Sequence, residues 1–170
     1  EDAFALLQYL GAESAGSLTL LPPGEELPKA SALRDLPYEK LSSRIANLPR
    51  LTLSADAPKR MSLAGAQHKL LVVYHEGHLY EPEGATPSTH ILKPNHPDTD
   101  SYPASVVNEY LTMRLAKAVG LPVPKVHMLY VPEAVYVIQR FDRFTTEATP
   151  PGARPPLNVH GRSVAESTAM

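Results

Sequence analysis

The chain has 170 residues, of which 43% are hydrophobic and 20% charged, which is ordinary for a soluble globular protein with one modest core or two small ones. Its formal net charge of -2 gives no global basic field of the kind that draws a protein to nucleic acid or to an anionic membrane, so we expect neither as a direct partner. The chain has no cysteine, which excludes disulfides and thiolate metal sites, and no apolar stretch approaching roughly 20 residues, so a cytoplasmic location is favoured.

The first part of the chain, residues 1–55, is predicted to belong to a small α/β unit. A helix is expected over residues 4–10, where apolar residues recur at helical spacing before a glycine, and a strand over residues 17–21. A second helix is expected over residues 38–47, because its apolar residues keep helical spacing and Pro49 follows it.

The middle of the chain changes to the pattern of β-strands. Residues 70–74 and 78–80 are predicted to form a hairpin with Gly77 in its turn. A third strand is expected over residues 89–93, where β-branched and apolar residues run up to Pro94.

A long helix and two further strands are predicted next. The helix is expected over residues 101–120, with a serine at its start and a proline in its first turn. The strands are expected over residues 126–131 and 134–141, and residues 145–170 are predicted to be loop or disordered. One stripe of the helix is formed by Val107, Leu111, Leu115 and Ala118.

Three small residues in succession precede the hairpin, within residues 62–69. Small residues let successive backbone amides approach a phosphate closely. On spacing alone, a tight turn before a strand is the more frequent meaning of such a pattern. The residues that would face a nucleotide are Ala64, Gly65, Ala66, Gln67, His68 and Lys69.

Two charged residues follow this loop in a meaningful order. Lys93 ends the third predicted strand and Glu109 lies in the first half of the long helix. Taken singly, Lys93 is typical of a solvated strand end and Glu109 of a charge that complements the helix dipole. Together, the order of loop, strand lysine and helix glutamate is that of the small lobe of protein kinases, where these parts hold ATP.

The histidines and the acidic loop do not predict a metal site. His75 and His78 flank the predicted turn with no third or fourth ligand near them in the sequence. Asp98 and Asp100 lie in a polar loop without the glycine and glutamate that complete a calcium loop. We therefore assign no metal ligand to this chain.

Four segments that carry these features also occur in a recognisable order. They are SLAGAQHK at residues 62–69, TPSTHILKP at 86–94, NEYLTMRLAKAVGL at 108–121 and YVIQRFDR at 136–143. They resemble the HipA family of bacterial serine/threonine kinase toxins, most specifically in AGAQ-x-K and QRFDR. The resemblance runs from about residue 1 to residue 144, and the family pattern is expected to fade after that point.

The resemblance implies an α+β fold. A protein-kinase-like small lobe, with an antiparallel sheet and one main helix, would occupy residues 56–144 after part of an amino-terminal subdomain at residues 1–55. It also implies ATP and Mg²⁺ as cofactors. Residues 64–69 would form the phosphate loop, although Gln139 stands where a glutamate is more usual. The further residues with implied roles are Lys93 for phosphate, Glu109 as its partner, Gln139, Arg140 and Phe141 at the adenine, and Ser62 for autophosphorylation.

By the same resemblance, the intact protein would phosphorylate a serine or threonine of a translation component such as an aminoacyl-tRNA synthetase. Its partner would be a DNA-binding antitoxin of HipB type, within a toxin–antitoxin module linked to persistence. The catalytic aspartate and the magnesium ligands belong to a carboxy-terminal lobe that we do not find here, so no catalytic residue is assigned.

Two questions stay open from the sequence alone. The chain could be a non-catalytic binding module, or a truncated remnant, that engages an antitoxin or a partner subunit. It could also be a fragment, one half of a split toxin, or the product of a frameshift, which the change in composition near Thr145 favours.

Overall fold

The computed structural model contains six strands and two helices in the residues that it describes. The predicted helix over residues 4–10 and the tail over residues 145–170 lie outside this set, as does the predicted strand over residues 17–21 apart from residue 21. The described residues are 21, 23–26, 31–48, 50, 51, 53, 56, 57 and 67–143. The elements are β1 (Ser31–Asp35), α2 (Tyr38–Ala46), β2 (Leu70–His75), β3 (His78–Gly84), β4 (His90–Pro94), α3 (Ser105–Ala118), β5 (Val126–Tyr130) and β6 (Ala134–Gln139).

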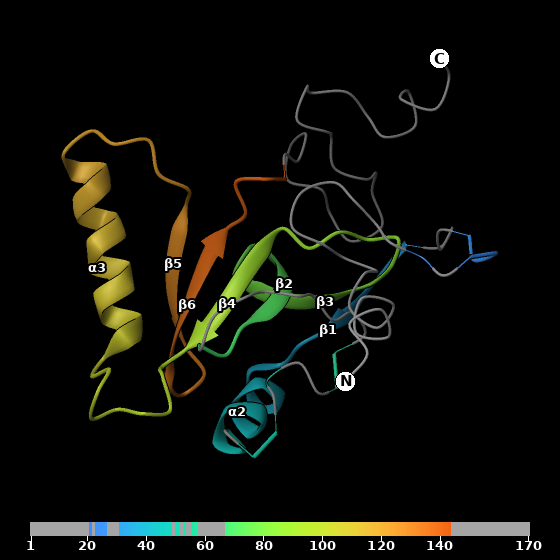
Figure 1. Ribbon diagram of the computed structural model, residues 1–170, viewed down its shortest axis with the longest axis horizontal. Helices are drawn as coiled ribbons and strands as arrows, with labels where there is room; N and C mark the ends of the chain where they lie inside the picture. The colour runs from blue at the N-terminus through green and yellow to red at the C-terminus, as the bar shows by residue number, and fades with distance from the viewer. Residues whose placement is uncertain are drawn as a thin grey trace.

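The strands form one sheet in the order β1-β3-β2-β4-β6-β5 (Figure 1). Every neighbouring pair is antiparallel, and the sheet curls between its edges at β1 and β5. The helix α3 packs beside β5 and β6 at one side of the molecule, well away from α2. The predicted α+β class and the antiparallel sheet are therefore confirmed.

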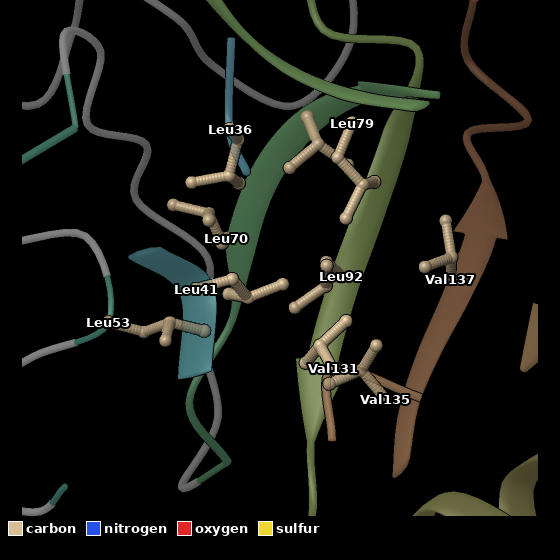
Figure 2. Close-up of a cluster of buried hydrophobic side chains, with 10 residues drawn as sticks. Leu36, Leu41, Leu53, Leu70, Leu79, Leu92, Val131, Val135 and Val137 are labelled. Carbon is tan, nitrogen blue, oxygen red and sulfur yellow. The ribbon is translucent and has the colours of Figure 1, made fainter. Parts of the chain in front are cut away.

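The hydrophobic core lies between α2 and one face of the sheet. Side chains from α2, β2, β4 and β6 converge there, as Figure 2 shows for Leu41, Leu92 and Val135. Alternate residues of a strand point to opposite faces, so Tyr136 between Val135 and Val137 points away from this core. The buried members of the core are Leu36, Leu41, Leu53, Leu70, Val72, Leu79, Leu92, Val131, Val135 and Val137.

Strand β1 is the element that the sequence does not predict. It forms by pairing with β3, with Ser31 opposite Gly84 and Asp35 opposite Tyr80. Its residues share one sheet with residues 67–143, and Leu53 is buried in the same core. The packing of the described residues runs across the predicted division near residue 55. The division itself stays a prediction.

A buried cluster of charges fastens β1 and α2 to β3. The Glu81 side chain on β3 is only 1% exposed and accepts hydrogen bonds from Arg44 at 2.6 and 3.2 Å. Arg34 on β1 donates to the same carboxylate at 2.7 and 3.0 Å. Arg34 also donates to the backbone oxygen of Asp56 at 2.6 Å. The Glu81 carboxylate therefore connects three parts of the chain, namely β1, α2 and β3.

The start of α3 differs from the prediction. The helix begins at Ser105, not at residue 101, and the residue before it, Ala104, has a left-handed backbone with φ of 49°. The side chain of Asn95 caps it from the preceding loop by accepting a hydrogen bond from the Val106 backbone at 3.1 Å. The serine and proline at positions 101 and 103 therefore belong to a turn, because the cap comes from a residue distant in sequence.

The apolar stripe of α3 faces outward. Leu111 and Leu115, which the sequence places on one stripe, are 57% and 65% exposed. The residue that the helix buries fully is Val106, which is 0% exposed. The sheet covers the helix face that carries Val106 and Glu109, so the leucine stripe lies on the outer side of the helix.

Three aromatic rings, those of Tyr74, His90 and His127, pack together on the core face of the sheet. Tyr74 lies with its ring centroid 4.6 Å from that of His127 and 5.7 Å from that of His90. Burial lowers the pKa of His90 to about 4, with His127 and Lys125 adding to the effect. This histidine is therefore neutral in the folded protein near neutral pH.

We expect this histidine to make folding sensitive to mild acid. The unfolded chain takes up the proton near pKa 6.5 and the folded chain only near pKa of about 4, so the unfolded state binds more protons between these values. Stability should fall with decreasing pH in this window, with a slope of up to about 1.4 kcal/mol per pH unit from His90. Urea unfolding at a series of pH values measures it. The slope should shrink in His90→Gln and persist in His78→Gln, and an unchanged slope in His90→Gln would contradict the assignment.

Candidate nucleotide-binding site

The lysine and the glutamate that the sequence singles out meet in space. Lys93 Nζ lies 2.6 Å from Glu109 Oε2, and the two side chains are 21% and 33% exposed. A partly exposed ion pair contributes little to stability, typically about 0–1 kcal/mol. Its partial exposure leaves the remaining donors of the ammonium accessible to a ligand.

A short connection brings the pair together. Lys93 is the last residue but one of β4, and Asn95 just beyond it caps α3 through Val106. Glu109 follows Val106 by about one helical turn and so lies on the same side of α3. The end of one strand and the first turns of one helix therefore fix both charges.

A tyrosine that the sequence analysis did not single out completes the surroundings of the lysine. Tyr136 on β6 is the register partner of Lys93 on β4, and the lysine Nζ lies 5.7 Å from the centre of its ring. Burial raises the pKa of the Tyr136 phenol to about 12, and the negative charge of Glu109 adds to this rise. No local sequence signal marks this tyrosine, because its place depends on strand register.

The end of the predicted phosphate loop lies near the same point. Gln67 Nε2 donates a hydrogen bond to the backbone oxygen of Pro94 at 3.3 Å, one residue beyond Lys93. Lys69 directly precedes Leu70, which pairs with Leu92. Burial lowers the pKa of His68, and His96 contributes to the shift. The loop residues Ser62, Ala64, Gly65 and Ala66 lie outside the described residues.

The predicted hinge is held by backbone hydrogen bonds. The amide of Gln139 donates to the Lys125 carbonyl at 2.9 Å, and the amide of Arg140 donates to the Thr89 carbonyl at 2.9 Å. Phe141, which follows, is 83% exposed. The two amides are therefore used in hydrogen bonds within the protein. The exposed Phe141 ring is the part of the hinge most accessible to a ligand.

The Arg140 side chain is enclosed in the protein. It is 1% exposed, and its guanidinium donates to both carboxylate oxygens of Asp142 at 2.9 and 2.6 Å. It also donates to Ser88 Oγ at 2.7 Å. A buried bidentate pair of this kind fixes geometry, so the Arg140 side chain holds the hinge in shape.

From the family resemblance we expect Gln139, Arg140 and Phe141 to share a nucleotide site with Lys93. Gln139 pairs with His90 and Tyr136 pairs with Lys93, so three residues of β6, roughly 10 Å, separate the hinge from the lysine. The structure therefore brings Lys93 and Glu109 together and bonds Gln67 to the adjacent Pro94. The hinge residues lie apart from them, at and beyond the end of β6.

Within the described residues, neither α2 nor α3 is long and apolar enough to cross a membrane. The described residues also contain no group of three or more histidine, cysteine or acidic side chains placed to hold a metal ion.

Known proteins similar to this chain are kinases and components of toxin–antitoxin systems. The family model described as the HipA-like C-terminal domain matches residues 61–167. The chain belongs to the HipA family. The match extends through the segment after residue 144, so the expectation that the family pattern fades there was wrong, and the argument for a frameshift loses its support.

Individual relatives agree with this assignment. The chain is 33% identical to the serine/threonine-protein kinase toxin HipA of Shewanella oneidensis, over 84% of this chain and 32% of that protein. It is 38% identical to the putative kinase Y4mE of Sinorhizobium fredii, over 83% of this chain and 34% of that protein. The chain thus spans about a third of the length of these curated relatives.

A solved structure shares the fold. It is the complex of HipA, HipB and operator DNA from Shewanella oneidensis, with a TM-score of 0.69 and 31% sequence identity. The match covers 92% of this chain and 35% of that one.

Proposed function

We propose that this chain forms the phosphate-binding part of an ATP site of the protein-kinase small-lobe type. The observation that carries the proposal is the contact of 2.6 Å between Lys93 Nζ and Glu109 Oε2. A kinase needs such a pair, because the glutamate holds the lysine where it can neutralise phosphate charge.

The described residues suggest how the phosphates are held. Lys93 keeps one donor on Glu109 and offers the others to phosphate oxygens, while the bond from Gln67 to Pro94 keeps the end of the loop beside it. Residues 64–69 would supply backbone amides, and Lys69 a second positive charge. When bound, ATP would supply the phosphoryl group, and Mg²⁺ would supply positive charge to neutralise the phosphates.

The adenine would lie toward the hinge. Arg140 holds this segment in shape through Asp142 and Ser88, and Phe141 offers an exposed ring on which a base can stack. Gln139 lies at the start of the same segment. Because the hinge and Lys93 lie apart along β6, the adenine and the phosphates would contact different parts of the sheet.

For the intact protein we propose phosphorylation of a serine or threonine on a translation component such as an aminoacyl-tRNA synthetase, in the cytoplasm. The partner would be a HipB-type antitoxin, as in the matching complex. The general base and the magnesium ligands would come from parts of the family protein that this chain does not contain. Ser62 would be a site of autophosphorylation.

A second candidate function is a non-catalytic module that binds a partner. Leu111 and Leu115 on the outer side of α3, with Val119 directly after its last residue, are 57%, 65% and 68% exposed. Exposed apolar stripes are typical of interaction surfaces. This candidate predicts partner binding without nucleotide binding.

Isothermal titration of the 170-residue chain with Mg-ATP separates the two candidates. We expect saturable binding with a dissociation constant at or below about 1 mM, the upper end of ordinary substrate affinities. No binding at millimolar Mg-ATP would favour the partner-binding module. Phosphate transfer by this chain alone would contradict the assignment of the catalytic base to an absent part.

A further inference from the structure

The side chain opposite Lys93 in the sheet is a buried tyrosine. Tyr136 is 1% exposed, yet it points away from the hydrophobic core and toward α3. Directly opposed residues on neighbouring strands have Cβ atoms roughly 5 Å apart, which is close enough for their side chains to interact. The ring of Tyr136 therefore lies on the same face of the sheet as the ion pair of Lys93 and Glu109.

The ammonium of Lys93 lies between two different partners. Glu109 Oε2 is 2.6 Å from Nζ, and the centre of the Tyr136 ring is 5.7 Å from it. An aromatic face attracts a cation at distances within about 6 Å, and the attraction increases when water is partly excluded. Lys93 is only 21% exposed, so water is partly excluded here.

A lysine held by a carboxylate alone keeps considerable freedom. Its four-carbon stem is flexible, and a single ion pair lets the ammonium move around the carboxylate. A ring below the ammonium removes part of this freedom without using a donor, since the attraction is to the ring face. The donors that Glu109 leaves unused then stay directed to the open side.

We propose that Tyr136 is a positioning residue that holds the ammonium of Lys93 in place for a phosphate ligand. For its effect on ATP this inference rests on the function proposed above. The contact between ring and ammonium can be tested without any nucleotide. The alternative is that Tyr136 only fills space between the sheet and α3.

Two of the substitutions that separate these roles keep the volume of the ring. Tyr136→Phe retains the ring and its negative face, whereas Tyr136→pentafluorophenylalanine retains the shape and reverses the charge of the face. Tyr136→Leu removes the ring altogether. Tyr130→Leu is the matched control, because Tyr130 on β5 is 63% exposed.

The first measurement is NMR of the protein labelled at lysine, without nucleotide. The ring current of Tyr136 should shift the Lys93 side-chain methylene signals, and the ammonium signal of Lys93 should be sharpened by restricted exchange. Both signatures should persist in Tyr136→Phe. The sharpened ammonium signal should be lost in the pentafluoro variant, and both signatures in Tyr136→Leu if that variant folds. A sharp ammonium signal in the folded pentafluoro variant would overturn the inference, whatever the chain does with ATP.

The second measurement is the dissociation constant for Mg-ATP. The pentafluoro variant should bind roughly three- to tenfold more weakly than Tyr136→Phe. In a Lys93→Ala background, the pentafluoro variant and Tyr136→Phe should differ in affinity by less than twofold, because the ammonium that the ring would hold is absent. Equal losses in the two backgrounds would show a space-filling role and contradict the proposal. Absence of Mg-ATP binding by the unaltered chain would instead refute the proposed function. The NMR measurement alone would then test whether Tyr136 holds the Lys93 ammonium.

Discussion

Replacing Glu81 with glutamine is expected to lower the free energy of unfolding by about 3–5 kcal/mol, because it removes one charge from a buried network. The Glu81 side chain is 1% exposed, and that of Arg44 is 8% exposed. The substitution would leave the Arg44 guanidinium buried without its counter-charge and would also weaken the bonds from Arg34. Chemical denaturation followed by circular dichroism measures the loss.

The same strand offers a matched control. Glu83 lies two residues from Glu81, its side chain is 38% exposed, and it approaches Arg34 only at 3.8 Å. Glu83→Gln should therefore cost less than about 1 kcal/mol, as exposed ion pairs do. Equal losses in the two variants would show that the buried carboxylate has no special role.

Replacing Lys93 with alanine is expected to weaken Mg-ATP binding by roughly 10- to 100-fold, the range of one charge-assisted hydrogen bond or somewhat more. The free energy of unfolding should change by about 1 kcal/mol or less, since the pair with Glu109 is partly exposed. Titration calorimetry and denaturation of the same sample measure both quantities.

Lys117→Ala serves as the control for that experiment. Lys117 lies in the last turn of α3 and is exposed, so its removal changes net charge equally without touching the pair. Its affinity for Mg-ATP should stay within about twofold of the unaltered chain, because exposed charges are screened by salt. Equal affinity in Lys93→Ala and the unaltered chain would exclude a phosphate-binding role for Lys93.

Local sequence patterns predicted the elements whose structure has local causes. The helix α2 and the strands β2, β4, β5 and β6 follow from periodicity and from the prolines and glycines at their ends. The order of Lys93 and Glu109 was also readable, because β4 and α3 are consecutive along the chain. Their contact then follows from the short connection between them.

Features that depend on distant partners were not readable. The five residues of β1 become a strand by pairing with β3, which lies more than forty residues away. The start of α3 depends on the Asn95 side chain, and the place of Tyr136 on strand register. Periodicity correctly put Leu111 and Leu115 on one stripe of a helix, but only the packing decides which stripe the sheet covers.

The buried cluster around Glu81 also limits how this protein can be dissected. Both of its guanidinium partners, Arg34 and Arg44, precede residue 57, whereas the carboxylate lies in the hairpin that follows the candidate phosphate loop. An expression fragment starting at residue 58 would contain the lysine, the glutamate and the hinge, but it would bury an anion with no cation beside it. We therefore expect that the part of the sheet that carries Lys93 does not fold without residues 31–57, which supply the two cations and part of the core.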